Sequence, residues 1–252
     1  MISTNRPILA ALAAPLALAL AACGSNEAEG GEGSLQGEPI AAIAAPAGQQ
    51  WTDTVTVSDH DGYILGNPDA PIKVLEYASL TCPACAAFAA DGADQLKEEY
   101  VNTGRVSYEL RNQIHGPHDL ILARMVRCGQ KEAYHPRSDM VWKNLQTVLQ
   151  PVFDNQEAFG QALQLPEDQR FVQAAQIAGF YDFFSRFGLS RDEAQSCLTD
   201  FASMETIAAN STQQSNEFEV TGTPTFFVNG RKQDGVGSWA NLEPILQQAG
   251  AR

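Results

Sequence analysis

Two cysteines separated by two residues, Cys82 and Cys85, offer the clearest chemistry in this sequence. They stand in the segment Thr-Cys-Pro-Ala-Cys, and a disulfide at this spacing closes a small ring that forms and breaks readily. Such a pair can also be a structural clip or half of a zinc site, but a structural zinc site needs two further Cys or His ligands. The sequence has no second Cys-x-x-Cys pair, and its four histidines show no ligand spacing with cysteine. We therefore interpret the pair as a redox couple that needs no metal and no cofactor beyond its own disulfide.

The elements expected around the pair favour this interpretation. The apolar run of residues 72–77 (Ile-Lys-Val-Leu-Glu-Tyr) predicts a buried strand. Pro83 suits the first turn of a following helix, which we expect to run to about Tyr100. Cys82 would then be the N-cap residue, where the unpaired N–H groups and the positive end of the helix dipole stabilise a thiolate. Both effects lower the pKa of Cys82 and make it the attacking sulfur, with Cys85 as the more buried resolving thiol.

Two further positions could take part in the same chemistry. Glu76 lies six residues before Cys82 on the predicted strand, and burial beneath the pair would raise its pKa and let it exchange a proton with Cys85. An edge-exposed or salt-bridged glutamate is the alternative. A cis bond between Thr223 and Pro224 would place the Thr223 backbone beside the sulfurs, ready to pair with an extended substrate. Residue type alone argues against it, since only about 5–6% of X–Pro bonds in folded proteins are cis.

The remaining patterns predict an α/β fold. Residues 105–111 alternate apolar and polar side chains, which predicts a second strand and hence a βαβ unit with parallel strands. Apolar residues at three- and four-residue spacing predict an all-helical block over about 118–216. A β-rich run before Asn229-Gly230 indicates a hairpin, and residues 238–248 a closing helix. We expect one mixed sheet built from the βαβ and ββα halves, with the helical block inserted between them.

The first 50 residues indicate export. Residues 1–22 join a weakly positive start to an apolar run too short for a comfortable membrane span, as in a signal peptide. The run ends in Leu-Ala-Ala-Cys, which resembles a bacterial lipoprotein signal with Cys23 as the acylated first residue of the mature chain; ordinary secretory cleavage is the alternative. Gly24 after the cysteine favours the outer membrane of a two-membrane cell. Residues 23–50 have almost no bulky side chains and predict a disordered tether. Residues 51–252 fit one globular domain.

With Cys23 set apart as the lipidation site, four cysteines remain. An even number in an exported protein suggests two disulfides, for which the sequence alone allows three pairings. The economical pairing joins Cys82 to Cys85 and Cys128 to Cys197. Two buried free thiols in the helical block are the alternative to the second bond.

The charge of the chain bears on its partners. The formal net charge is −14, and no basic stripe or basic amphipathic helix occurs. This composition argues against nucleic acid as a partner. It does not choose among protein substrates.

The two motifs together resemble the DsbA family of thioredoxin-fold proteins. The resemblance rests on residues 72–85 and on residues 222–230 (Gly-Thr-Pro-Thr-Phe-Phe-Val-Asn-Gly), and it extends from about residue 60 to the end, helical block included. It implies a thioredoxin-like sheet and a second, structural disulfide of the kind that some bacterial relatives carry in this block. It further implies a nucleophile at Cys82, a resolving thiol at Cys85, a buried acid at Glu76 and a cis-proline at Pro224, beside Thr223 at the substrate.

Two departures from DsbA leave the direction of electron flow open. Ala84 replaces a histidine that helps to stabilise the thiolate, and Thr223 replaces a valine, as in isomerase- and reductase-type relatives. We expect a protein that donates its disulfide to exported proteins with cysteines and is reoxidised by a DsbB-like membrane protein. The alternative is a reductase or isomerase kept reduced by a DsbD-like membrane donor. A hypothesis of another class is a copper-binding lipoprotein that uses the same two thiols, since copper(I) favours soft ligands.

Overall fold

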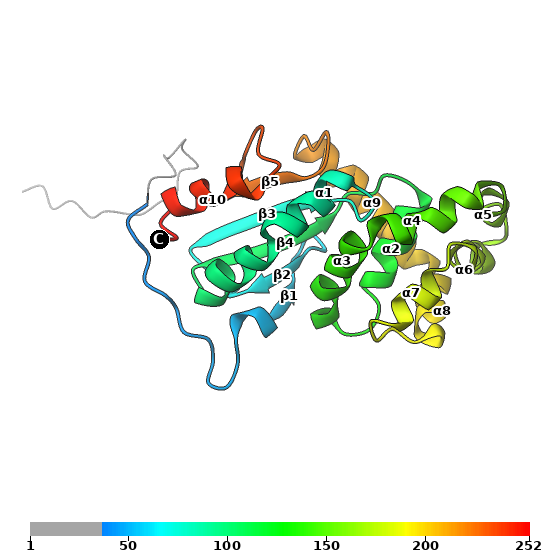
Figure 1. Ribbon diagram of the computed structural model, residues 1–252, viewed down its shortest axis with the longest axis horizontal. Helices are drawn as coiled ribbons and strands as arrows, with labels where there is room; N and C mark the ends of the chain where they lie inside the picture. The colour runs from blue at the N-terminus through cyan, green and yellow to red at the C-terminus, as the bar shows by residue number, and fades with distance from the viewer. Residues whose placement is uncertain (1–36) are drawn as a thin grey trace, which may run out of the picture. The chain divides into compact units, whose positions relative to one another are not determined.

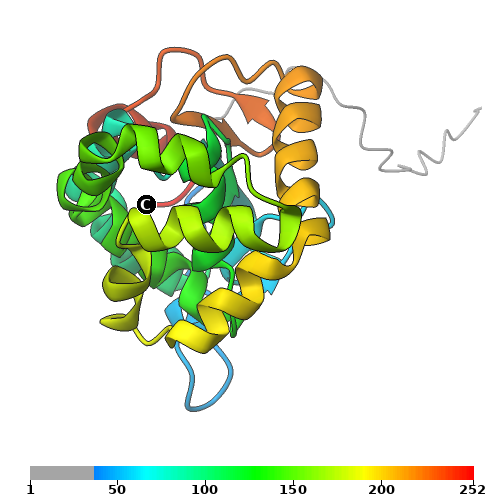
Figure 2. The ribbon, with the colours of Figure 1, turned by 90° about the vertical axis from the view of Figure 1, so that its right-hand side faces the viewer.

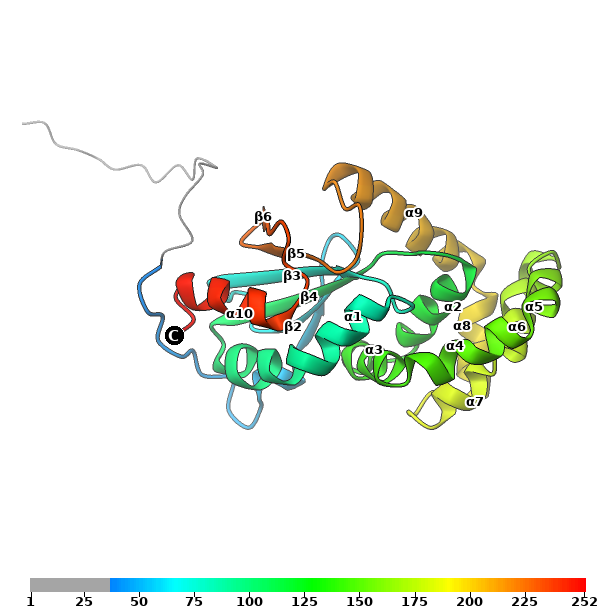
Figure 3. The ribbon, with the colours of Figure 1, turned by 45° about the horizontal axis from the view of Figure 1, so that its top comes forward.

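The computed structural model describes residues 37–252, whose centre is a mixed sheet of six strands (Figures 1 and 3). Their spatial order is β1-β2-β4-β3-β5-β6. The strands are β1 (Val55–Val57), β2 (Tyr63–Gly66), β3 (Ile72–Ala78), β4 (Val106–Asn112), β5 (Thr225–Val228) and β6 (Arg231–Lys232).

The strands on either side of β3 follow the prediction. β3 and β4 are parallel, from Ile72 opposite Val106 to Ala78 opposite Asn112. β5 lies antiparallel on the other side of β3 and turns into β6. The turn residues Asn229 and Gly230 both have positive φ, 50° and 76°, as a type I′ hairpin requires. The predicted α/β fold, a mixed thioredoxin-like sheet with a helical insertion, is confirmed.

Two strands near the N-terminus were not predicted. β1 and β2 pair with each other in antiparallel fashion, and β2 also pairs with β4. They are three and four residues long, too short for a periodic pattern to stand out. Their extended conformation depends on the neighbouring strand, because β-propensity reflects packing within a sheet more than the residues themselves.

The helix that follows Cys82 changes its winding along its length. It begins as α1 (Pro83–Phe88), continues through two π-helical segments, Ala89–Ala93 and Leu96–Tyr100, and ends in a 3-10 turn, Val101–Thr103. Within it, Gly92 allows a close approach of the closing helix α10 (Trp239–Gln248), because a Cβ there would meet the Trp239 side chain at 2.2 Å.

The helical insertion lies between β4 and β5 and forms the end of the molecule that faces the viewer in Figure 2. Its aromatic residues Phe180, Phe183 and Phe184 are buried in the core. Cys128 and Cys197 are joined by a disulfide with a Cα–Cα distance of 6.1 Å. The helices are α2 (Pro117–Val126), α3 (Tyr134–Lys143), α4 (Leu145–Asp154), α5 (Gln156–Ala162), α6 (Glu167–Ile177), α7 (Phe180–Ser185), α8 (Arg191–Thr199) and α9 (Phe201–Glu217), and short 3-10 turns span Trp51–Asp53 and Lys131–Ala133.

Residues 37–50, which we assigned to a disordered tether, run along the folded part instead. Three of their backbone N–H groups donate hydrogen bonds of 2.8–2.9 Å to backbone carbonyls: Gly37 to Gln248, Ile40 to Gly250 and Ile43 to Thr103. The structure corrects the prediction for this stretch. Composition did not reveal it because backbone hydrogen bonds do not depend on bulky side chains.

The remaining N-terminal predictions concern residues 1–36. The signal peptide, the lipidation site Cys23 and the first part of the tether therefore lie outside the described residues. Within residues 37–252, none of the helices combines the length and the hydrophobicity needed to cross a bilayer.

The Cys128–Cys197 disulfide closes a long loop, with a sequence separation of 69 residues. Replacing both cysteines by alanine should lower the free energy of unfolding by roughly 4 kcal/mol on the chain-entropy model. Urea denaturation under oxidising conditions measures the change, with the reduced wild type as a control. A double variant as stable as the oxidised wild type would contradict a structural role for this bond.

Candidate active site

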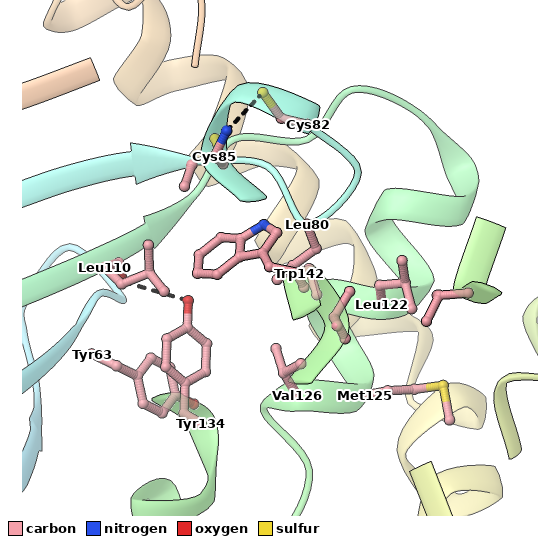
Figure 4. Close-up of a cluster of buried hydrophobic side chains, with 14 of the residues drawn as sticks. Tyr63, Leu80, Cys82, Cys85, Leu110, Leu122, Met125, Val126, Tyr134 and Trp142 are labelled. Atoms are coloured by element: carbon pink, nitrogen blue, oxygen red, sulfur yellow. Dashed lines mark hydrogen bonds between the residues drawn. The ribbon is translucent and has the colours of Figure 1, made fainter. Parts of the chain in front are cut away.

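The strand β3 and the helix α1 bring Cys82 to the N-cap position that the sequence predicted. Cys82 has an extended backbone (φ −86°, ψ 120°), Pro83 is the first helical residue, and the Cys82 Sγ accepts a hydrogen bond of 3.4 Å from the Cys85 N–H (Figure 4). Both cysteines are free thiols, Cys82 with 8% of its surface exposed and Cys85 with none. One sulfur is therefore accessible and the other enclosed.

The surroundings shift the acidities of the two thiols in opposite directions. The hydrogen bond from the Cys85 thiol, helped by the backbone N–H groups of Ala84 and Cys85, lowers the pKa of Cys82 to about 5 against the effect of burial. The same thiol contact raises the pKa of Cys85, and burial and the negative charge of Glu76 raise it further. At neutral pH, Cys82 is thus a thiolate and Cys85 a protonated thiol.

The loop before β5 lies against the reactive sulfur. The Thr223–Pro224 peptide bond is cis, and in the thiol form Cys82 donates a hydrogen bond of 3.3 Å to the Thr223 carbonyl oxygen. A groove of about 440 Å³ begins here, between Ala84 on α1, the loop 221–225 and residues 232–237. The loop residues that line the groove have small, mostly polar side chains, so an extended peptide can approach the backbone.

Glu76 is fully buried on β3. The Tyr108 hydroxyl of the neighbouring strand donates a hydrogen bond to its Oε2 atom, while its Oε1 atom is buried without a partner. Burial raises the pKa of Glu76 to about 8, and the bond from Tyr108 offsets part of this rise. The carboxyl group is therefore mostly protonated at pH 7. It lies close enough to the pair that its ionised form raises the pKa of Cys85.

Two residues that position the site were not identified from the sequence. Tyr108 alternates with polar residues on its strand, in line with Val106 and Leu110, and this alternation was the signal. It pairs with Val74 and so lies on the same face of the sheet as Glu76. Trp142, from the helical insertion, lies beneath the cysteine turn (Figure 4) and donates its Nε1–H to the Ser79 carbonyl at 3.0 Å. No sequence pattern pointed to that contact.

The other predicted positions are separate from the pair. Cys128 and Cys197 are in the helical insertion, bonded to each other, and Cys23 lies outside the described residues. His115, for which the sequence indicated no role, has its Nε2 atom 3.4 Å from the Thr223 hydroxyl. Over residues 37–252, no three or more His, Cys, Asp or Glu side chains cluster as a metal site would require.

The arrangement matches a known family. The family described as Thioredoxin covers residues 58–248 of the chain. This protein belongs to the thioredoxin family. Its thioredoxin fold is DsbA-like, since the helical insertion interrupts it between β4 and β5.

Solved structures of two thioredoxin-fold proteins are similar to it. A protein-disulfide isomerase from Novosphingobium aromaticivorans has a TM-score of 0.69 and 29% identity, over 74% of this chain and 96% of that one. The alpha-DsbA1 protein of Wolbachia pipientis has a TM-score of 0.61 and 23% identity, over 75% of this chain and 92% of that one, a likeness of fold.

Among curated relatives, a provisionally assigned protein-disulfide oxidoreductase of Rickettsia bellii is 28% identical over 173 residues. The match covers 68% of this chain and 58% of the relative. The chain thus spans a little over half the length of the curated relatives that it matches first.

The buried carboxyl of Glu76 makes stability depend on pH. Its pKa is about 8 in the folded protein against an ordinary value of 4.5, so between these values the folded protein keeps a proton that the unfolded chain has lost. The free energy of unfolding of the wild type should therefore fall as the pH rises from 4.5 to 8. Glu76→Gln has no proton to lose and keeps an oxygen for Tyr108.

At pH 8 the Glu76→Gln variant should accordingly be more stable than the wild type by on the order of a few kcal/mol, and the gain should vanish toward pH 4.5. Urea denaturation across this range measures the difference. Glu205→Gln, at an exposed position of α9, is the control and should show no such trend. A gain from Glu76→Gln that is the same at every pH would contradict the burial argument.

Proposed function

We propose that the protein is a thiol–disulfide oxidoreductase that acts through Cys82 and Cys85. The observation that carries the proposal is the N-cap geometry of Cys82, whose sulfur accepts the Cys85 N–H and lies beside the Thr223 carbonyl. An acidic, partly accessible thiol with a second thiol one helical turn away is the arrangement that thiol–disulfide exchange requires. The assigned activities of the Novosphingobium and Rickettsia relatives support the same reaction class.

In the oxidative direction the reaction begins with the Cys82–Cys85 disulfide. A substrate thiolate attacks the Cys82 Sγ, the bond between the two sulfurs breaks, and the electron pair leaves on Cys85, which takes a proton from the neutral Glu76. A second substrate thiolate then attacks the substrate sulfur of the mixed disulfide and expels Cys82 as a thiolate. The substrate gains a disulfide, the protein gains two reduced sulfurs, and Glu76 recovers its proton from solvent.

The direction we favour is donation of disulfides to exported proteins. A thiolate held at a pKa of about 5 stabilises the reduced protein, and a stabilised reduced form makes a disulfide oxidising. Two residues favour the reverse direction, that of a reductase or isomerase. Ala84 replaces a thiolate-stabilising histidine, and Thr223 resembles the residue of isomerase- and reductase-type relatives. A reduction potential close to about −120 mV in glutathione buffers would support the oxidase, and one close to about −270 mV would overturn it.

The mixed disulfide gives a direct test of the site. Cys85→Ser removes the resolving thiol, so substrates should remain bound to Cys82 when the variant is expressed in the native host, and Cys82→Ser should trap none. Non-reducing gels followed by mass spectrometry identify the trapped proteins. Exported proteins with cysteines are the expected clients. Equal trapping by the two variants, or by neither, would contradict the roles assigned to the two sulfurs.

We propose further that the protein is lipid-anchored through Cys23 on the periplasmic side of the cell envelope, with a slight preference for the outer membrane. A DsbB-like membrane protein would reoxidise it there, or a DsbD-like donor would serve the reverse direction. The support is the Leu-Ala-Ala-Cys segment and the glycine that follows it.

Replacing Cys23 by alanine tests the anchor. The wild type should incorporate a labelled fatty acid and sediment with membranes, whereas Cys23→Ala should lose the label and appear in the soluble fraction, because no acyl acceptor remains. Cys85→Ala, which removes a different cysteine, should keep the label. A wild type without label would contradict lipidation.

A further inference from the structure

Asp119 is a buried carboxylate that takes no part in the thiol–disulfide exchange proposed for Cys82 and Cys85. It lies in the first turn of α2 with none of its surface exposed. Its two oxygens accept three hydrogen bonds, from the Ser79 hydroxyl (2.7 Å), the Leu80 N–H (3.1 Å) and the His115 N–H (2.9 Å). Two of these donors belong to the turn between β3 and Cys82. A helix of the insertion thus reaches the segment that presents the reactive sulfur.

Ser79 in turn forms hydrogen bonds to the residues around Cys82, so that Asp119 is linked to the cysteine through Ser79. Its hydroxyl oxygen accepts the Thr81 N–H at 3.0 Å, and its carbonyl accepts the Cys82 N–H at 3.3 Å. The same carbonyl accepts the Trp142 indole N–H. The backbone that leads into α1 is therefore fixed through Ser79, and the side chain of Ser79 is fixed by Asp119.

The third bond of Asp119 reaches the opposite side of the site. By accepting the His115 N–H, the carboxylate holds the loop between β4 and α2, and the His115 ring lies 3.4 Å from the Thr223 hydroxyl. One buried group thus braces both the cysteine turn and a neighbour of the cis-proline loop. The titratable group that acts on it across these contacts is His115, from the β4–α2 loop. His118 precedes it on α2.

We propose that Asp119 is a positioning residue of the redox site, whose ionised carboxylate holds the turn of residues 79–81 so that the sulfur of Cys82 meets the N–H groups of α1. The inference rests on the proposed function, and it assigns to the helical insertion a part in setting the redox properties of the pair. Loss of the carboxylate should let the turn shift and weaken the N-cap bond to the thiolate.

If Asp119 positions the turn, its removal changes the reduction potential in one direction; if Asp119 acts only through its charge, its removal changes the potential in the other direction. Removing a negative charge near a thiolate would stabilise that thiolate and make the disulfide more oxidising. Removing the brace would destabilise the thiolate and make the disulfide less oxidising. Burial raises the pKa of Asp119 to about 6, so the carboxylate is ionised at pH 7.5, where the two effects can be compared.

The experiment measures the equilibrium of the full-length protein with glutathione at pH 7.5. Asp119→Asn replaces an accepting oxygen by a donating amide, so at least one of the three donors loses its acceptor. We expect the equilibrium constant for reduction by glutathione to fall about tenfold, the factor for one pKa unit, which corresponds to a potential lower by about 30 mV. An unchanged or increased constant overturns the proposal.

Two further variants keep the result interpretable. Ser79→Ala removes the hydroxyl that links Asp119 to Thr81, and it should shift the equilibrium constant in the same direction. This variant tests the proposal even if Asp119→Asn does not fold. Ser138→Ala removes another buried hydrogen bond, from Ser138 to the Tyr134 carbonyl in α3, and should leave the constant unchanged. If Ser138→Ala shifts the equilibrium constant as much as Ser79→Ala does, the effect comes from general destabilisation of the fold, and the proposal is overturned.

The wild-type measurement separates this inference from the function on which it rests. A wild-type Cys82 that titrates as an ordinary thiol refutes the proposed function whatever Asp119 does. A wild type with an acidic Cys82 and an Asp119→Asn variant with the same potential refutes only the positioning role.

Discussion

The contact between the Cys82 sulfur and the Cys85 N–H at the start of α1 is the interaction on which the chemistry of this protein depends. It combines an unpaired donor of the first helical turn with a side chain that has just left a strand. Several parts of the fold meet to produce it. β3 delivers the chain, Pro83 starts the helix, the loop before β5 supplies the Thr223 carbonyl, and the helical insertion supports the turn from behind through Trp142.

Hydrogen bonds and burial together set the pKa values of the three ionisable groups of the site. The thiol with the most hydrogen-bond donors around it becomes acidic, whereas the enclosed thiol and the enclosed carboxyl hold their protons. These differences arise within one short stretch of chain, from Glu76 to Cys85, because a strand and a helix place neighbouring residues in very different surroundings. A leaving thiolate and a proton donor are therefore available together at neutral pH.

Features set by local sequence could be predicted, and features set by distant contacts could not. The N-cap at Cys82 and the Asn229-Gly230 turn each follow from a few adjacent residues, and the structure contains both. β1, β2 and residues 37–50 acquire their conformation from backbone bonds to partners far along the chain. Within the site, Cys82, Cys85 and Glu76 are marked by spacing, whereas Asp119 and Trp142 act from helices whose packing no short motif encodes.

Residues 37–50 are bonded at one end of the central strands, and Cys82 lies at the other. Their hydrogen bonds hold them at Gly250 and at Thr103, just before β4 and near the beginning of its parallel neighbour β3, while Cys82 follows the other end of β3 (Figure 1). A strand of seven residues separates the two ends, roughly 20 Å at the usual rise. The first residues that the structure describes are thus held at the end of the sheet opposite to the one that presents the Cys82 sulfur.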